Sequence, residues 1–121
     1  MTNIFQPYTF RRSGLTAKNR ITLAPMTNGQ SREDGTLGDD EYRWLIRRAK
    51  ENFGVIITCA AHVSEDGQGW PGELGIWDDK HISGLKRLAD GLHEFGTLAL
   101  VQIFHGGARS PEHLIGTQPW S

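Results

Sequence analysis

The sequence is poor in the features that mark secreted and membrane proteins. It contains a single cysteine, Cys59, so no disulfide can form within the chain, and this suits a reducing cytosol. No apolar run approaches the roughly 20 residues that a transmembrane helix needs. The first six residues lack both a basic start and a continuous hydrophobic stretch, so we expect no signal peptide and a cytoplasmic location.

Positive and negative charges are nearly balanced. The chain of 121 residues carries 13 Lys and Arg against 14 Asp and Glu, a net charge of −1. This balance gives no electrostatic reason to expect nucleic acid or an anionic membrane surface as a partner. The apolar share of 37% is low, but four Trp and five Phe exclude a disordered tail.

Several ligand-binding motifs are also missing. No G-x-G-x-x-G follows the first predicted strand, and no P-loop is present, so neither dinucleotide nor P-loop chemistry is indicated. Cys59 and His62 lie three residues apart, and His105 and His113 lie eight apart. Neither spacing is that of a zinc site, so we predict no metal.

The first 20 residues form a predicted antiparallel hairpin. Two short β-prone runs, residues 8–10 and 15–17, flank a polar turn that ends in Gly14. A short apolar strand follows over residues 21–26, and a polar loop over residues 28–38 is expected at the surface.

Two successive units of helix, glycine and buried strand make up most of the remaining chain. In the first unit, apolar residues at positions 42, 45, 46, 49 and 53 form one helical stripe. Asp39 or Asp40 is the predicted N-cap of this helix, and Gly54 is its predicted stop. Residues 55–61 then form a strand that is apolar on both faces.

The second unit repeats this order. An apolar stripe over residues 82–95 predicts a helix that Gly96 ends, and residues 97–104 predict another buried strand. Strands without a polar face are typical of a parallel sheet with helical crossovers, so the fold class is α/β. Three parallel strands would leave an unpaired edge and an uncovered face, so we expect an incomplete domain.

Ligands of parallel α/β folds bind beyond the carboxyl ends of the strands. The long loop over residues 62–79 follows one such end and is either functional or a plain surface loop. It contains Trp70 and Trp77, which favours the functional interpretation. His81 and His93 flank or lie on the second helix and are predicted to be solvated.

Two polar residues at strand ends leave alternatives open. Gln102 interrupts an apolar strand and is either a core amide satisfied by the backbone or an amide that reaches a ligand. Thr27 either ends its strand through a local backbone bond or faces a ligand.

A series of short motifs runs along the chain: residues 19–27 (NRITLAPMT), 41–49, 53–58 (FGVIIT), 67–72 (GQGWPG), 75–77 (GIW) and 101–109 (VQIFHGGAR). In their order and spacing these motifs resemble the old yellow enzyme family of FMN-dependent NAD(P)H:flavin oxidoreductases, and the resemblance covers nearly all of the chain. It implies a (β/α)8 TIM barrel of which residues 1–121 are the N-terminal part. Residues 1–20 would close the barrel floor, and residues 21–121 would supply three strands, two helices and active-site loops.

The resemblance also implies roles for five residues. Thr27 matches a position beside the C4 carbonyl of the flavin, where a hydroxyl donor would tune the reduction potential. Pro25, Met26 and Ala60 match residues that line the flavin, and Gln102 matches the amide that binds its pyrimidine edge.

The implied activity is hydride transfer from NAD(P)H to FMN and then to an electron-poor acceptor such as an α,β-unsaturated carbonyl compound. A complete barrel of this type needs roughly 250 residues. The resemblance therefore places the substrate-anchoring pair, the proton-donating Tyr and the phosphate loops outside this chain, and no catalytic residue within it. The alternative is a non-catalytic α/β module, or a subunit whose partner chain completes the barrel.

Overall fold

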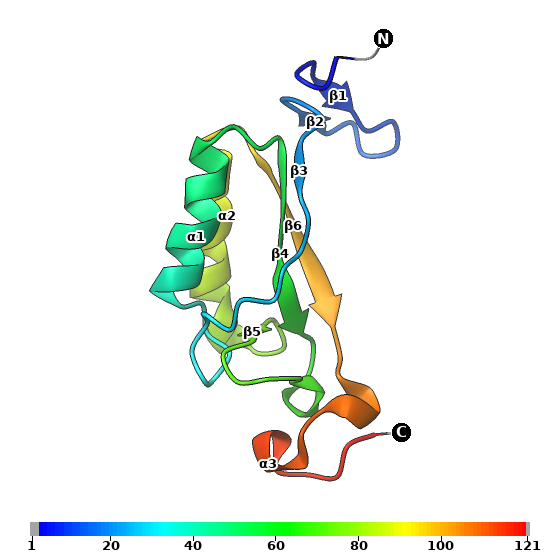
Figure 1. The fold of residues 1–121 in the computed structure, drawn as a ribbon, viewed down its shortest axis with the longest axis vertical. Coiled ribbons are helices and arrows are strands. Elements are labelled where there is room, and N and C mark those ends of the chain that lie inside the picture. Colours follow the sequence, from blue (N-terminus) through cyan, green and yellow to red (C-terminus); the bar gives the residue numbers. More distant parts are fainter. Residues whose placement is uncertain (1–2, 121) are drawn as a thin grey trace.

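A computed structural model describes residues 3–120 of the chain (Figure 1). Its centre is a parallel sheet of four strands: β3 (Thr22–Leu23), β4 (Val55–His62), β5 (Leu74–Gly75) and β6 (Leu98–Phe104). β6 pairs with β4 from Val55 to His62. On the other edge of β4, β3 pairs with its first two residues and β5 with its last two. The three predicted parallel strands are confirmed, and β5 is a fourth that the sequence did not reveal.

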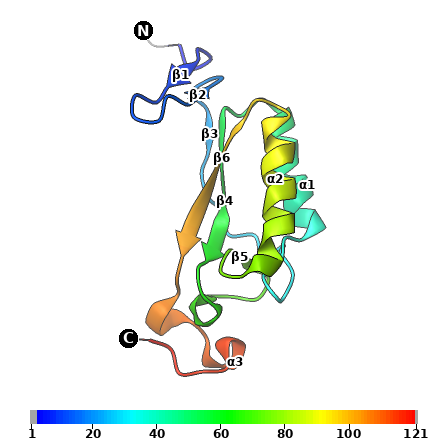
Figure 2. The ribbon, with the colours of Figure 1, turned by 180° about the vertical axis from the view of Figure 1, so that it is seen from behind.

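Two helices, α1 (Asp39–Lys50) and α2 (Ile82–His93), lie side by side on one face of this sheet (Figures 1 and 2). Their apolar stripes pack onto the sheet, as the helical spacing predicts. The largest apolar side chains of the resulting core are almost completely buried: Leu45, Ile56, Leu74 and Leu92. The order of β3, α1, β4, α2 and β6 is that of two βαβ units, for which right-handed crossovers are the rule.

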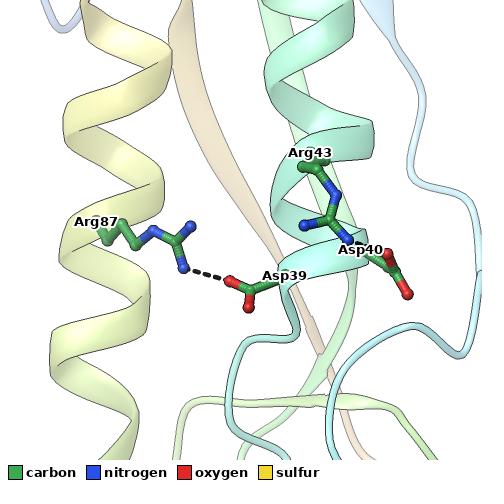
Figure 3. Close-up of polar contacts among 4 residues, drawn as sticks. All are labelled: Asp39, Asp40, Arg43 and Arg87. Carbon is green, nitrogen blue, oxygen red and sulfur yellow. Dashed lines mark hydrogen bonds and ion pairs between the residues drawn. The ribbon is translucent and has the colours of Figure 1, made fainter.

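The start of α1 differs from the prediction that Asp39 or Asp40 caps it. Gly38 is the N-cap, and no side chain caps the helix, because both aspartates already belong to its first turn. There their negative charges interact favourably with the positive end of the helix dipole. Asp39 also binds Arg87 of α2 at 2.7 Å, and Asp40 binds Arg43 at 2.5 Å (Figure 3).

The predicted stop of α1 is also wrong. The helix ends at Lys50, and Asn52, not Gly54, takes the left-handed conformation with φ 73°. Gly54 instead begins the approach to β4, where an added Cβ would lie 2.5 Å from the backbone oxygen of Asn19. Glycine is needed at this position for close packing rather than for its dihedral angles.

The loops depart from expectation in two places. Leu37 is buried in the core, so the loop over residues 28–38 does not lie wholly at the surface. His81 is only 2% exposed, because the 3-10 turn η2 (Asp79–His81) directs it inward against Trp77. The prediction that His81 is solvated is therefore wrong, whereas His93 is exposed as predicted.

The two ends of the sheet carry different segments. The hairpin of β1 (Tyr8–Thr9) and β2 (Thr16–Ala17) is antiparallel, as predicted, and lies where the strands of the sheet start (Figure 1). Two 3-10 turns, η1 (Glu65–Gly67) and η3 (Gly107–Arg109), lie at the opposite end. A four-residue helix, α3 (Glu112–Ile115), follows there.

The sheet face opposite the helices is uncovered within residues 3–120 (Figure 2). β6 is exposed on both faces, and its apolar residues Leu100, Val101 and Ile103 are 47%, 46% and 69% exposed. None of the helices in the described part of the chain is long and apolar enough to span a membrane.

Candidate functional site

A β-bulge in β4 decides which side chains share the uncovered face. Ile57 pairs with Leu100, but the next pair is Ala60 with Gln102, so three steps along β4 match two along β6. The bulge contains Thr58, whose hydroxyl oxygen accepts a hydrogen bond from the backbone N–H of Gln102 at 3.2 Å. Paired residues of parallel strands point to the same side, so the bulge brings Ala60 onto the face of Gln102.

That face is the one opposite the helices. Ala99 packs against the helix-covered core, and side chains alternate along a strand, so Leu100 and Gln102 point the other way. Ala60 is 5% exposed, whereas Gln102 is exposed. Within residues 3–120 the Gln102 side chain is therefore exposed rather than buried in a core. The structure places Ala60 and Gln102 side by side, and the amide is accessible.

Pro25, Met26 and Thr27 follow β3 as an unpaired segment. Pro25 is half-buried, and Met26 and Thr27 are exposed. Just beyond Thr27, the backbone of Asn28 lies near the Cys59 thiol of β4. Thr27 directly precedes Asn28, and Ala60 directly follows Cys59.

A buried polar group supports this contact from the helix side. Glu41 of α1 is fully buried and accepts a hydrogen bond from the hydroxyl of Ser31, and burial raises its pKa. Burial and the nearby Glu41 carboxylate raise the pKa of the Cys59 thiol to about 12. The sequence analysis missed Glu41, although its spacing of four from Leu45 and eight from Ala49 puts it on the apolar stripe.

An aromatic pocket lies at the carboxyl end of β6. The rings of Trp70 and Phe104 pack with centroids 5.2 Å apart. These two rings line a cavity of about 430 Å³ together with Gly69, His105, Gly106 and Arg109. Phe104 lies two residues beyond Gln102 and so points to the same face of the sheet. The expectation that the Trp70 loop borders a site at the strand ends agrees with this cavity, but the sequence analysis did not identify Phe104.

A buried acid and a buried imidazole lie behind the aromatic pocket. Glu73 is 1% exposed and His62 is 2% exposed, and the distance from Glu73 Oε2 to His62 Nδ1 is 3.8 Å. Burial raises the pKa of Glu73 to about 7. Burial, and then the nearby His81, lower the pKa of His62 to about 4.

These groups do not form a metal centre. Within residues 3–120, no three or more His, Cys, Asp and Glu side chains are arranged to hold a metal ion. The polar residues at this end of the sheet are therefore arranged around hydrogen bonds and aromatic contacts.

Comparison with known proteins identifies the family. The model of the NADH:flavin oxidoreductase / NADH oxidase family matches residues 3–119. The chain belongs to this family. A probable NADH-dependent flavin oxidoreductase of Bacillus subtilis, YqiG, is 46% identical over 115 residues, which are 95% of this chain and 30% of YqiG. The NADH:fumarate oxidoreductase of Klebsiella pneumoniae is 35% identical over 93% of this chain and 12% of its own length.

Solved structures of the family show the same fold. An old yellow enzyme homologue from Zymomonas mobilis superposes with a TM-score of 0.88 at 33% identity, over 98% of this chain and 32% of that one. Morphinone reductase superposes with a TM-score of 0.83 at 29% identity, over 96% of this chain and 30% of that one. The chain therefore has the fold of the N-terminal part of an old yellow enzyme barrel, which confirms the predicted fold class. It spans about a third of the length of most of these relatives.

Proposed function

We propose that the chain forms the flavin-binding arc of an FMN-dependent oxidoreductase that takes its hydride from NAD(P)H. The observation that carries this proposal, beside family membership, is the bulge in β4. It puts the small side chain of Ala60 next to the accessible amide of Gln102 on an uncovered sheet face. A planar ring needs such a flat floor with a donor and an acceptor at one edge.

The residues at this face fit FMN in size and chemistry. Gln102 offers one donor and one acceptor to the pyrimidine edge, and Ala60 leaves room above the sheet. Pro25 and Met26 would line the ring, and the Thr27 hydroxyl would donate beside the C4 carbonyl. Bound FMN would supply hydride transfer between the nicotinamide and a second substrate, and this chain would bind and orient the ring.

The aromatic pocket beside Gln102 suits the second substrate. Trp70 and Phe104 give it flat apolar walls on the sheet face that carries the proposed flavin positions. Two relatives are named for fumarate and morphinone, and both compounds have a carbon–carbon double bond conjugated to a carbonyl. An α,β-unsaturated carbonyl compound is therefore the proposed acceptor class, and the reaction is an ene reduction.

The 121 residues alone are not expected to hold FMN tightly or to turn over. The exposed faces of β6 indicate that further barrel residues cover it in the working enzyme. We expect the natural full-length polypeptide to work in the cytoplasm, because the buried thiol of Cys59 needs no disulfide partner.

The test uses the natural full-length polypeptide that contains residues 1–121. Purified protein should carry FMN, oxidise NADH or NADPH, and reduce 2-cyclohexenone under anaerobic conditions. Gln102→Leu removes the amide from an accessible position and should weaken FMN binding about tenfold or more, since a hydrogen-bond partner in the bound state is lost. Leu100→Met, on the same face, is the matched control. A protein that purifies without flavin and gains none from added FMN would refute the proposal.

A second candidate function follows from the same exposed strand. The chain would then be a subunit that completes its barrel with another polypeptide through β6. Native mass measurement separates the two functions: a second chain of about two thirds of a barrel supports the subunit, and one long chain supports the enzyme.

A further inference from the structure

We propose that Glu73 is a positioning residue, whose buried carboxyl group holds Trp70 against Phe104 and so sets the shape of the acceptor pocket. This inference rests on the proposed function, because it assigns a role within that pocket. Glu73 itself does not line the cavity, so its effect must pass through the backbone.

The hydrogen bonds of the turn over residues 69–73 converge on Glu73. Its Oε2 accepts the backbone N–H of Gly69 at 2.6 Å, and its own backbone N–H donates to the carbonyl of Trp70 at 3.4 Å. The same carbonyl accepts from the side chain of Gln68 at 3.2 Å. The position of Trp70 is therefore fixed by its backbone on both sides.

The turn also packs directly on the aromatic wall. A Cβ added to Gly69 would lie 3.0 Å from the ring of Phe104 and 3.6 Å from Oε2 of Glu73. The backbone of Gly69 thus fills the space between the carboxyl group and the ring. Loss of the Glu73 acceptor would leave the N–H of Gly69 without its partner, and relaxation of the turn would shift the neighbouring Trp70.

His62 gives this carboxyl group a second buried neighbour. Oε1 of Glu73 and Nδ1 of His62 are both buried without a hydrogen-bond partner in the described residues, while Oε2 lies 3.8 Å from Nδ1. The charge of Glu73 should therefore matter, because an ionised carboxylate accepts the N–H of Gly69 more strongly than a neutral acid does. Trp70 should be held more firmly when Glu73 is ionised.

Other titratable and charged groups lie near the turn and the pocket. They come from each element packed here, namely His62 of β4, Asp66 of η1, Lys80 and His81 of η2, Asp34 of the loop before α1, and His105 and Arg109 after β6. Variants must separate Glu73 from these, above all from His105, which lines the cavity.

The experiment uses the FMN-loaded full-length polypeptide with 2-cyclohexenone as the probe. In wild type, KM should fall as the pH rises through about 7, where Glu73 ionises, with kcat changed less than KM. Glu73→Gln keeps an acceptor oxygen but cannot ionise, so its KM should stay at the acidic value. Glu73→Leu and Trp70→Phe should each raise KM about tenfold, and their double variant should be no worse than either alone.

A measurement without flavin or turnover separates this inference from the proposed function. The near-ultraviolet circular dichroism of the Trp70–Phe104 pair should change with a midpoint near pH 7, where Glu73 ionises. This change should vanish in Glu73→Gln and in Trp70→Phe but persist in His105→Gln and in His93→Gln. A change that persists in Glu73→Gln, or that vanishes only in His105→Gln, would overturn the role of Glu73. If Glu73→Leu does not fold, the Gln variant and Trp70→Phe still decide the question.

Discussion

The buried pair of Glu73 and His62 should give the protein two opposite pH dependences of stability that largely cancel. Folding raises the pKa of Glu73 from 4.5 to about 7, so between these values the native state keeps a proton that the unfolded chain has lost. Stability then falls as the pH rises. Folding lowers the pKa of His62 from 6.5 to about 4, so between these values the unfolded chain binds a proton that the native state does not. Stability from this group falls as the pH drops.

Each effect should reach about 3 kcal/mol at most, because one pKa unit corresponds to about 1.4 kcal/mol and both side chains are almost fully buried. Removal of one group should reveal the other. The free energy of unfolding of Glu73→Gln should rise relative to wild type as the pH increases from about 4.5 to 7, by up to this amount. That of His62→Gln should fall relative to wild type over the same range.

The assay is urea denaturation of the full-length polypeptide at several pH values across this range, with each variant compared with wild type at the same pH. The comparison cancels the titration of every group that the substitution leaves unchanged. Two variants whose differences from wild type have the same slope, or no slope, would refute the assignment of opposite protonation states to this pair. His93→Gln, which changes an exposed histidine on α2, is the control and should show no slope.

Four further substitutions test the packing. Gly38→Ala should lower the free energy of unfolding by about 3 kcal/mol or more, because the added Cβ would overlap the backbone oxygen of Gln30. At Gly14 an added Cβ meets no neighbour, so Gly14→Ala should lower it by about 1 kcal/mol for the positive φ alone. Equal losses for the two variants in urea denaturation would contradict this packing. Arg87→Ala should cost less than about 1 kcal/mol, since its ion pair is half-exposed, and a larger loss would show coupling across the two helices. Leu45→Ala should cost about 2–5 kcal/mol, and a lower value in thermal or urea unfolding would mean that its site is not part of the closed core.

The helices and long strands could be predicted because their signals are local. The apolar stripe of α1 and the run of β4 that is apolar on both faces are both visible as local patterns in the sequence. In the structure these apolar residues are buried where the helix packs on the sheet. The two-residue strand β5 has no such signal. It exists only because Leu74 and Gly75 meet the end of β4, and a pairing between distant segments leaves no pattern in either of them.

The candidate site could be predicted in part for a similar reason. Gln102 stood out as a polar residue in an apolar strand, and family resemblance added Ala60, Thr27 and their neighbours. The bulge that aligns Ala60 with Gln102 depends on the register of two strands, which no single segment encodes. Buried polar residues such as Glu73 resemble surface residues in sequence, because burial depends on what other segments pack over them.

The most direct test of the flavin-binding arc is a crystal structure of the full-length polypeptide with FMN. The isoalloxazine ring should lie over Ala60, with the Gln102 amide within hydrogen-bond distance of the pyrimidine edge and the Thr27 hydroxyl beside the C4 carbonyl. A flavin bound on another face of the sheet, or a Gln102 side chain that turns away from the ring, would contradict the account.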